Sequence, residues 1–260
     1  QKRLAEARGG VQRWLYRSAF SQGICSLDGS GGAAYLPKLI HHATPMKVLL
    51  NGVDDRPGDP NIMTEIKREH GLGDRPIVSF VGRLEANKGC REFLEAVCEV
   101  SRNEGISFDT VIVGDGSLYR ELEQRIVDAR LENRIHLIGS VPHATIGSWL
   151  ELTSIYVSLN YFGNLSNANL EAVAAGKCVI VLDKDATTHT DLETEDVLPL
   201  DCVIRIDRDD IVNVLATTLK RLILEPDEVA AYSKRARLLS EETFSSWENR
   251  VDREIDLITA

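Results

Sequence analysis

Short runs of apolar, β-branched residues recur along the chain, and amphipathic stretches of helical period separate them. Each run is nearly continuous in its apolar character and ends beside Gly, Asp or Asn, which is typical of strands covered on both faces. Strands that alternate with helices in this way predict βαβ units. We therefore expect an α/β fold built on a doubly wound parallel sheet.

The pattern places the individual elements. Predicted core strands lie at 77–81, 110–113, 135–138, 155–159, 179–182 and 203–206, with helices at 88–102, 117–131, 145–151, 167–175 and 209–224. Upstream, helices are expected at 1–20 and 31–41 and strands at 22–26 and 47–50. Two closing helices should begin at Pro226 and Ser245, because proline favours the first helical position and Ser245 precedes Glu248 as in a capping box.

A turn-rich segment divides the chain. Residues 51–58 read Asn-Gly-Val-Asp-Asp-Arg-Pro-Gly, a density of turn formers that predicts a domain boundary. Residues 1–50 carry seven Lys and Arg against two acids, whereas the whole chain has a net charge of −10. We expect residues 1–50 to be the remnant of a preceding α/β domain with its linker, and residues 51–260 to be a separate ligand-binding domain. The basic stretch is either a solvated helix face or a contact with a partner domain or anionic membrane surface.

Composition narrows the class of protein. The 260 residues are 43% apolar, enough for a substantial core, and the acidic balance argues against a nucleic-acid partner. The five cysteines are widely spaced without a C-x-x-C pair, which predicts a reduced, cytoplasmic chain without disulfides or structural zinc. No apolar run approaches the ~20 residues of a membrane span. The absence of an initiator Met predicts a fragment of a longer parent chain.

Two cations follow the first predicted core strand. Gly82 precedes Arg83, and Lys88 comes five positions later. The carboxyl ends of parallel strands are where such sheets bind ligands, and a guanidinium fork beside a compact ammonium suits a diphosphate. Loop cations are more often merely solvated, which is the alternative for this pair.

The loop after the second core strand contains Gly114, Asp115 and Gly116, followed by Ser117. The glycines let a ligand approach the backbone, and Asp115 or Ser117 is expected to cap the next helix. Glycines that only shape the turn are the alternative. The loop lacks the third glycine of G-x-G-x-x-G, which argues against a nicotinamide dehydrogenase.

Small polar residues lead into a short helix after the fourth core strand. The free N–H groups at the start of that helix predict an anion site near Asn167, Ala168 and Asn169. Glu171 follows one turn inside, where its carboxylate can accept hydrogen bonds from ribose hydroxyls. A carboxylate that only complements the helix dipole is the alternative.

The motifs V-G-R-L-x-x-x-K-G, V-G-D-G, I-G-x-V and N-x-x-L-E-A-x-A-x-G-K, in this order, resemble the donor domain of group 1 (family 4) retaining glycosyltransferases over residues 47–183. The resemblance implies a Rossmann-like domain of the GT-B fold, a nucleotide-sugar substrate, retained anomeric configuration and no metal or other cofactor. It assigns catalysis to Arg83 and Lys88, and implies that Ile138 and Gly139 flank the base. The implied donor-binding residues are Gly82, Gly114, Asp115, Gly116, Ile138, Gly139, Asn164, Ser166, Asn167, Ala168, Asn169 and Glu171.

One position departs from the family pattern. The paired-glutamate motif E-x7-E would place its first Glu, which helps to orient the donor sugar, at Gly163. Asn160, Asn164, Ser166 or a backbone carbonyl are the candidate substitutes. His136 and His143 have no carboxylate partner in their own segments, so we expect both to pack or to lie at the surface.

We therefore predict the donor-binding half of a hexosyltransferase for polysaccharide biosynthesis. It would transfer a sugar from a nucleotide diphosphate, with UDP as the expected nucleotide, to a glycan or lipid-linked acceptor. The N-terminal domain of the same parent chain is an expected partner, and peripheral contact with the inner face of a membrane stays open. The alternatives are a non-catalytic nucleotide-sugar-binding or regulatory subunit, which Gly163 would mark, and an epimerase acting on the free nucleotide sugar.

Overall fold

The computed structural model describes residues 20–103 and 105–259, so the helix predicted at 1–20 lies outside the described residues except for its last position. The main body is a parallel sheet with the strand order β5-β4-β3-β6-β7-β8. Its strands are β3 (Ile77–Val81), β4 (Asp109–Val113), β5 (Ile135–Gly139), β6 (Ile155–Ser158), β7 (Cys178–Leu182) and β8 (Val203–Ile206). The predicted doubly wound α/β sheet is confirmed.

The chain builds this sheet outward in two directions. It lays down β3, β4 and β5 in one direction, returns to the other side of β3 for β6, and continues through β7 and β8. The order therefore reverses between β3 and β6, whose pairing is parallel at Val78 with Ile155 and at Ser79 with Tyr156. Ligands of open α/β sheets bind beyond the carboxyl ends of the strands at such a reversal.

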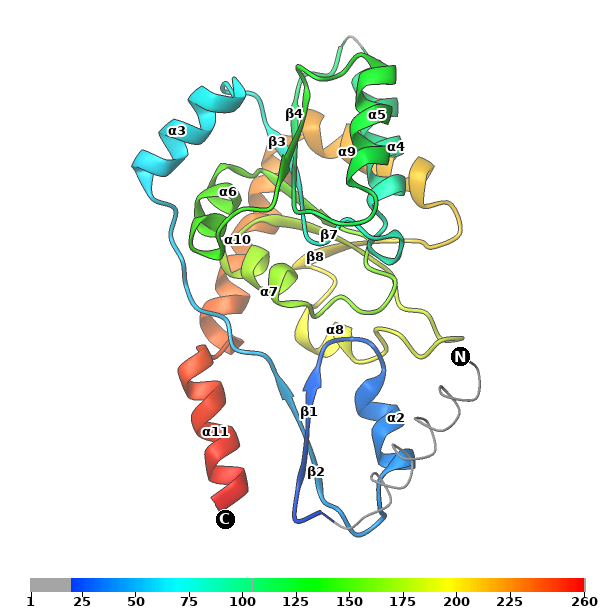
Figure 1. The fold of residues 1–260 in the computed structure, drawn as a ribbon, viewed down its shortest axis with the longest axis vertical. Coiled ribbons are helices and arrows are strands. Elements are labelled where there is room, and N and C mark those ends of the chain that lie inside the picture. The colour runs from blue at the N-terminus through cyan, green and yellow to red at the C-terminus, as the bar shows by residue number, and fades with distance from the viewer. Residues whose placement is uncertain (1–19, 104, 260) are drawn as a thin grey trace.

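Helices cover both faces of the sheet, as Figure 1 shows. One face carries α4 (Cys90–Ser101), α5 (Tyr119–Ala129) and α9 (Ile211–Leu224). The other carries α3 (Pro60–His70), α6 (Ile146–Leu152), α7 (Asn167–Ala174) and α10 (Pro226–Thr243). Successive side chains of β3 point to opposite faces of the sheet, and both faces are buried, which explains its continuous apolar run. Val78 and Phe80 join the core with α4, while Ile77 joins the core with α3 and α6.

The N-terminal part forms a second, two-stranded parallel sheet from β1 (Gly23–Leu27) and β2 (Met46–Leu50), joined by α2 (Gly32–Leu39). It lies at one end of the molecule, near α8 (Thr194–Val197) and beside the C-terminal helix α11 (Trp247–Thr259) (Figure 1). Arg250 of α11 donates from Nε to the carbonyl of Leu50 at 2.8 Å. The chain passes between the two sheets through residues 51–59.

Two local features differ from the sequence prediction. Helix α3 was not expected, because most of its residues are polar and Ile66 is its one buried residue. Its caps were the available signal: Asp59 accepts the amide of Asn61 at 2.8 Å, and Pro60 takes the first helical position. The predicted cap at Ser245 is wrong by one residue, because Ser246 Oγ accepts the amide of Asn249 at 3.2 Å.

Two ion pairs of the same length differ in burial. Arg75 reaches Asp109, whose side chain is fully buried, at 2.8 Å. Arg120 reaches Glu123 at 2.8 Å on the surface of α5, where both side chains are exposed. Loss of one partner is expected to lower stability strongly only in the pair that is removed from water.

Within the residues that the structure describes, no helix is both long enough and apolar enough to cross a membrane.

Candidate functional site

The loop from β3 to α4 carries the two predicted cations. Arg83 is exposed, and Lys88 ends a short 3₁₀ turn (Ala86–Lys88) and is half-buried. Burial lowers the pKa of Lys88 first, and the neighbouring charge of Arg83 lowers it further, while Asp28 raises it. Arg83 and Lys88 thus carry like charges in one loop and repel each other. A bound anion between them would relieve that repulsion.

The same loop contacts the segment that leads into α7. The carbonyl of Asn87 accepts the amide of Tyr161 at 3.0 Å. Residues 159–166 connect β6 to α7, so this contact ties the cation loop to the predicted anion site at the switch point between β3 and β6. The cation loop and the segment that leads into α7 therefore meet at one edge of the sheet.

A pocket of about 270 Å³ opens at the carboxyl ends of β3, β4 and β5. It is lined by Val81, Gly82, Arg83, Val113, Gly114, Asp115, Ser140, Val141 and Ile146. Gly114 is required there, because its φ is +139° and a Cβ would stand 1.8 Å from the carbonyl oxygen of Gly82. The close approach of these loops leaves four predicted residues, Gly82, Arg83, Gly114 and Asp115, around one opening.

The expected cap at Asp115 or Ser117 is not formed. Helix α5 begins after Leu118 without a side-chain cap. Asp115 instead accepts the amide of Gly116 at 2.7 Å, and the Ser117 hydroxyl donates to Glu85 at 2.6 Å. The hydrogen bonds from Ser117 lower the pKa of Glu85, so this carboxylate stays charged and fixes the β4–α5 loop against the cation loop.

Helix α7 begins as predicted, but its first polar residues divide into two groups. Ser166 is the N-cap and accepts the amide of Asn169 at 3.4 Å, so Ser166 and the amide of Asn169 serve the helix itself. The N–H groups of Asn167 and Ala168 have no partner within the first turn. These two amides are the donors that the helix presents to an anion.

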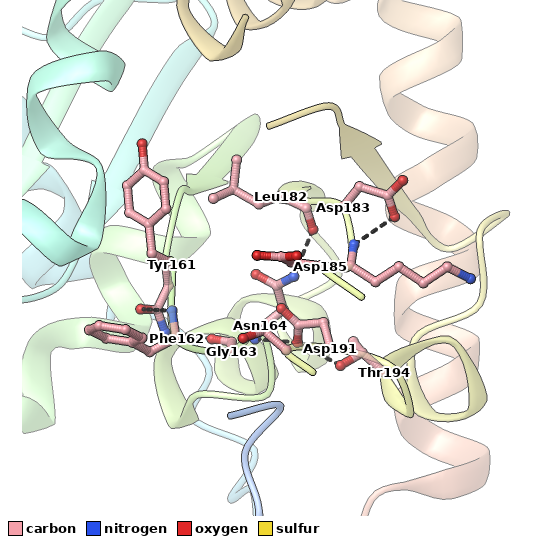
Figure 2. A network of polar contacts seen from close by, with 12 residues as sticks. Tyr161, Phe162, Gly163, Asn164, Leu182, Asp183, Asp185, Asp191 and Thr194 are labelled. Carbon is pink, nitrogen blue, oxygen red and sulfur yellow. Dashed lines mark hydrogen bonds between the residues drawn. The ribbon is translucent and has the colours of Figure 1, made fainter. Parts of the chain in front are cut away.

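The asparagines of the β6–α7 segment hold the loop together, as Figure 2 shows for Asn164. Asn164 is fully buried: its side-chain Nδ2 donates to the Leu182 carbonyl at 2.7 Å, and its backbone N–H donates to the carboxylate of Asp191. Asn160 is buried and bonds the backbone of Gly163 and Phe162. Asn169 accepts from the Tyr156 hydroxyl at 3.1 Å and donates to the Asn164 carbonyl. The structure therefore corrects the expectation that Asn164 or Asn160 presents its side chain to a sugar.

Glu171 has a partner that the sequence did not indicate. His143 Nε2 lies 3.0 Å from Glu171 Oε1, and Arg56 Nη1 lies 3.0 Å from His143 Nδ1. The expectation that His143 lacks a carboxylate partner is wrong, because the loop after β5 folds over the first turns of α7. Arg56 and Glu171 also line a small hollow next to Ile146, a residue of the larger pocket.

Ile138 and Gly139 lie at the end of β5, half-buried, and the Gly139 carbonyl accepts the amide of Gly114 at 2.8 Å. Residues 20–103 and 105–259 hold no cluster of three His, Cys, Asp or Glu side chains suited to a metal ion. A metal-free reaction stays a prediction.

Comparison with known proteins defines the class. The sequence model of the family described as glycosyl transferases group 1 matches residues 62–239. That range is more than half of the chain, so this chain belongs to the glycosyl transferases group 1 family, and the predicted family is confirmed. The α/β fold expected from the GT-B resemblance is confirmed as well.

Individual relatives share only low sequence identity with this chain. The alpha-D-kanosaminyltransferase of Streptomyces kanamyceticus is 33% identical over 119 residues, which are 46% of this chain and 31% of that protein. Sucrose-phosphate synthase from Thermosynechococcus elongatus superposes with a TM-score of 0.77 at 19% identity, over 98% of this chain and 61% of that one. Anabaena Alr3699/HepE, solved with UDP and glucose, gives 0.74 at 16% identity, over 91% and 63%. The chain thus spans about a third of the first relative, and the structural matches establish the fold alone.

Proposed function

We propose that this chain binds the nucleotide-sugar donor of a retaining glycosyltransferase, with a UDP-sugar as donor and a hydroxyl of a glycan or lipid-linked saccharide as acceptor. The observation that carries the proposal is the hydrogen bond between Asn87 and Tyr161, which joins the loop of Arg83 and Lys88 to the segment that leads into α7. The kanosaminyltransferase and the UDP complex of HepE support this class of substrate.

The chemistry follows from where charge develops. As the bond from the anomeric carbon to the diphosphate oxygen breaks, negative charge grows on the diphosphate. Arg83, Lys88 and the amides of Asn167 and Ala168 would stabilise that charge without a divalent cation. Loss of one preorganised donor of this kind costs about 2.7–4 kcal/mol of transition-state stabilisation in other enzymes. Glu171 would hold the ribose hydroxyls, and the pocket at the ends of β4 and β5 would take the base.

Calorimetry with UDP tests the site. Arg83→Ala and Lys88→Ala should each weaken UDP binding at least about tenfold, or ~1.4 kcal/mol. Arg68→Ala is the matched control, because Arg68 is an exposed cation on α3 outside the site. Unchanged affinity in both site variants would refute the assignment.

A second candidate is a non-catalytic nucleotide-sugar-binding subunit, which the missing side chain at Gly163 favours. Full-length protein incubated with labelled donors and acceptors separates the two. An enzyme releases nucleotide diphosphate and labels an acceptor, whereas a binding subunit retains donor affinity without either product.

The cellular setting is part of the proposal. All five cysteines are free thiols, which supports a reduced, cytoplasmic compartment. The acceptor-binding face would come from a further domain of the same parent chain.

A further inference from the structure

The loop after β1, residues 28–32, is packed directly on the donor side of the molecule. The carbonyl of Asp28 accepts the amide of Leu165 at 3.2 Å, and the carbonyl of Gly29 accepts the amide of Asp191 at 2.7 Å. Residues 28–32 lead from β1 of the two-stranded sheet into α2, while Leu165 lies just before α7. The loop after β1 therefore forms a wall beside the segment that leads into α7.

This wall fills the position where a side chain of residue 163 would lie. Gly163 has a φ of +125°, and a Cβ there would stand 2.3 Å from the Asp28 carbonyl oxygen and 2.7 Å from the Ser30 amide nitrogen. Backbone atoms cannot yield as a flexible side chain would. Residue 163 therefore has no side chain for a ligand, and the loop after β1 takes its place.

Asp191 fixes the two loops against each other. Its side chain is fully buried, and its Oδ1 accepts the amide of Asn164 and the hydroxyl of Thr194, both at 2.7 Å (Figure 2). Arg208 Nη2 lies 3.6 Å from the other carboxylate oxygen. Because its backbone amide also bonds Gly29, Asp191 sets the position of the loop after β1 relative to the donor segment.

The carboxylate of Asp28 is exposed on this wall. One oxygen, Oδ1, accepts the amide of Ser30 at 2.9 Å and its hydroxyl at 2.6 Å, which holds the side chain in place. The Asp28 carbonyl accepts the amide of Leu165, so this residue stands beside the segment that leads into α7, and its charge raises the pKa of Lys88. The side-chain N–H groups of Asn160 and Asn164 donate to the carbonyls of Gly163 and Leu182.

We infer that Asp28, which lies beside Gly163, determines donor specificity by accepting hydrogen bonds from hydroxyls of the donor sugar, in place of the side chain that position 163 lacks. The inference rests on the proposed function, because it needs a diphosphate between Arg83 and Lys88. A carboxylate here has opposite effects on the two halves of the ligand: it repels the diphosphate and attracts the hydroxyls of the sugar.

Asp28→Asn tests this with little change in shape. Calorimetry should compare UDP with UDP-glucose, UDP-galactose, UDP-N-acetylglucosamine and UDP-N-acetylgalactosamine on both proteins. For the sugar that the wild type prefers, the ratio of UDP-sugar to UDP affinity should fall at least about fivefold, as expected for loss of a charged hydrogen-bond acceptor. Affinity for UDP alone should stay within about twofold or increase, since a repulsive charge is removed.

Two further variants serve as a control and as a second test of the same loop. Asp74→Asn removes an exposed carboxylate before β3, at the opposite end of the strand, and should leave the ratio unchanged. Gly163→Ala should push residues 28–30 away and lower the ratio as Asp28→Asn does, provided that thermal denaturation shows a folded protein. Asp28→Asn decides the matter if Gly163→Ala fails to fold.

The possible failures are distinct. If the wild type binds neither UDP nor any UDP-sugar, the proposed function is overturned and this inference with it. If the wild type binds but Asp28→Asn leaves the ratio unchanged or weakens UDP and UDP-sugar equally, the assignment of Asp28 is overturned while the proposed function stands.

Discussion

Removal of the His143 side chain should weaken nucleotide binding by a small, defined amount. Arg56 has only N–H groups to offer, so His143 Nδ1 must accept, and the ring proton must then reside on Nε2. His143 thus donates from Nε2 to Glu171 Oε1. This orients the carboxylate and leaves Oε2 for a ribose hydroxyl.

The magnitude follows from the exposure of the two partners. A hydrogen bond to a charged group contributes about 1.5–3 kcal/mol when it is shielded from water. The His143 side chain is 61% exposed, although that of Glu171 is only 16% exposed, so water replaces much of the lost donor. We expect His143→Ala to cost about 1 kcal/mol, or roughly a fivefold loss of UDP affinity.

The assay is calorimetric titration of UDP into His143→Ala and His143→Gln. Glutamine places an N–H donor near the position of Nε2, so it should recover most of the affinity. His42→Ala, which removes a histidine between α2 and β2, is the control. UDP affinity in His143→Ala equal to or above that of the wild type would refute the reasoning, because His143 would then be neutral or would compete with the ribose for Glu171.

Three other outcomes are expected. Because the pKa of Lys88 is lowered, Lys88 should lose its charge at a pH below the usual lysine range, and wild-type UDP affinity should fall as pH rises through that lowered pKa. Lys88→Arg stays charged and should keep its affinity there, so parallel calorimetric profiles of the two proteins would contradict this. Arg75→Ala should lower the free energy of unfolding by about 3 kcal/mol, because it leaves the buried Asp109 carboxylate without its partner, and Arg120→Ala by less than ~0.5 kcal/mol in urea titrations, a contrast that equal losses would remove. Burial raises the pKa of Cys178 to about 12, so mass-spectrometric mapping should find Cys25 alkylated first in the folded protein, and early labelling of Cys178 would count against the described core.

Most of the fold was predictable because its strands are buried on both faces. The run Ile77–Val81 and the run Val203–Ile206 match the observed strands, since such segments carry a continuous apolar signal. Helix α3 was missed because it buries little and depends on its caps. The capping error at Ser245 has a similar origin, since adjacent serines offer the same chemistry and only the backbone path selects Ser246.

The candidate site was predictable where chemistry follows directly from position after a strand. Arg83 and Lys88 lie in the loop that follows β3, as the sequence indicated. The roles of Asn164 and His143 were not predictable, because they depend on contacts between segments far apart in the sequence. Asn164 is buried by its bonds to Leu182 and Asp191, and His143 meets Glu171 across 28 positions.

A crystal structure of the protein soaked in saturating UDP is the most direct test of the central claim. The account predicts the β-phosphate between Arg83 and Lys88, with phosphate oxygens accepting the amides of Asn167 or Ala168. Diphosphate density elsewhere on the molecule, or Arg83 and Lys88 turned away from a bound nucleotide, would contradict it.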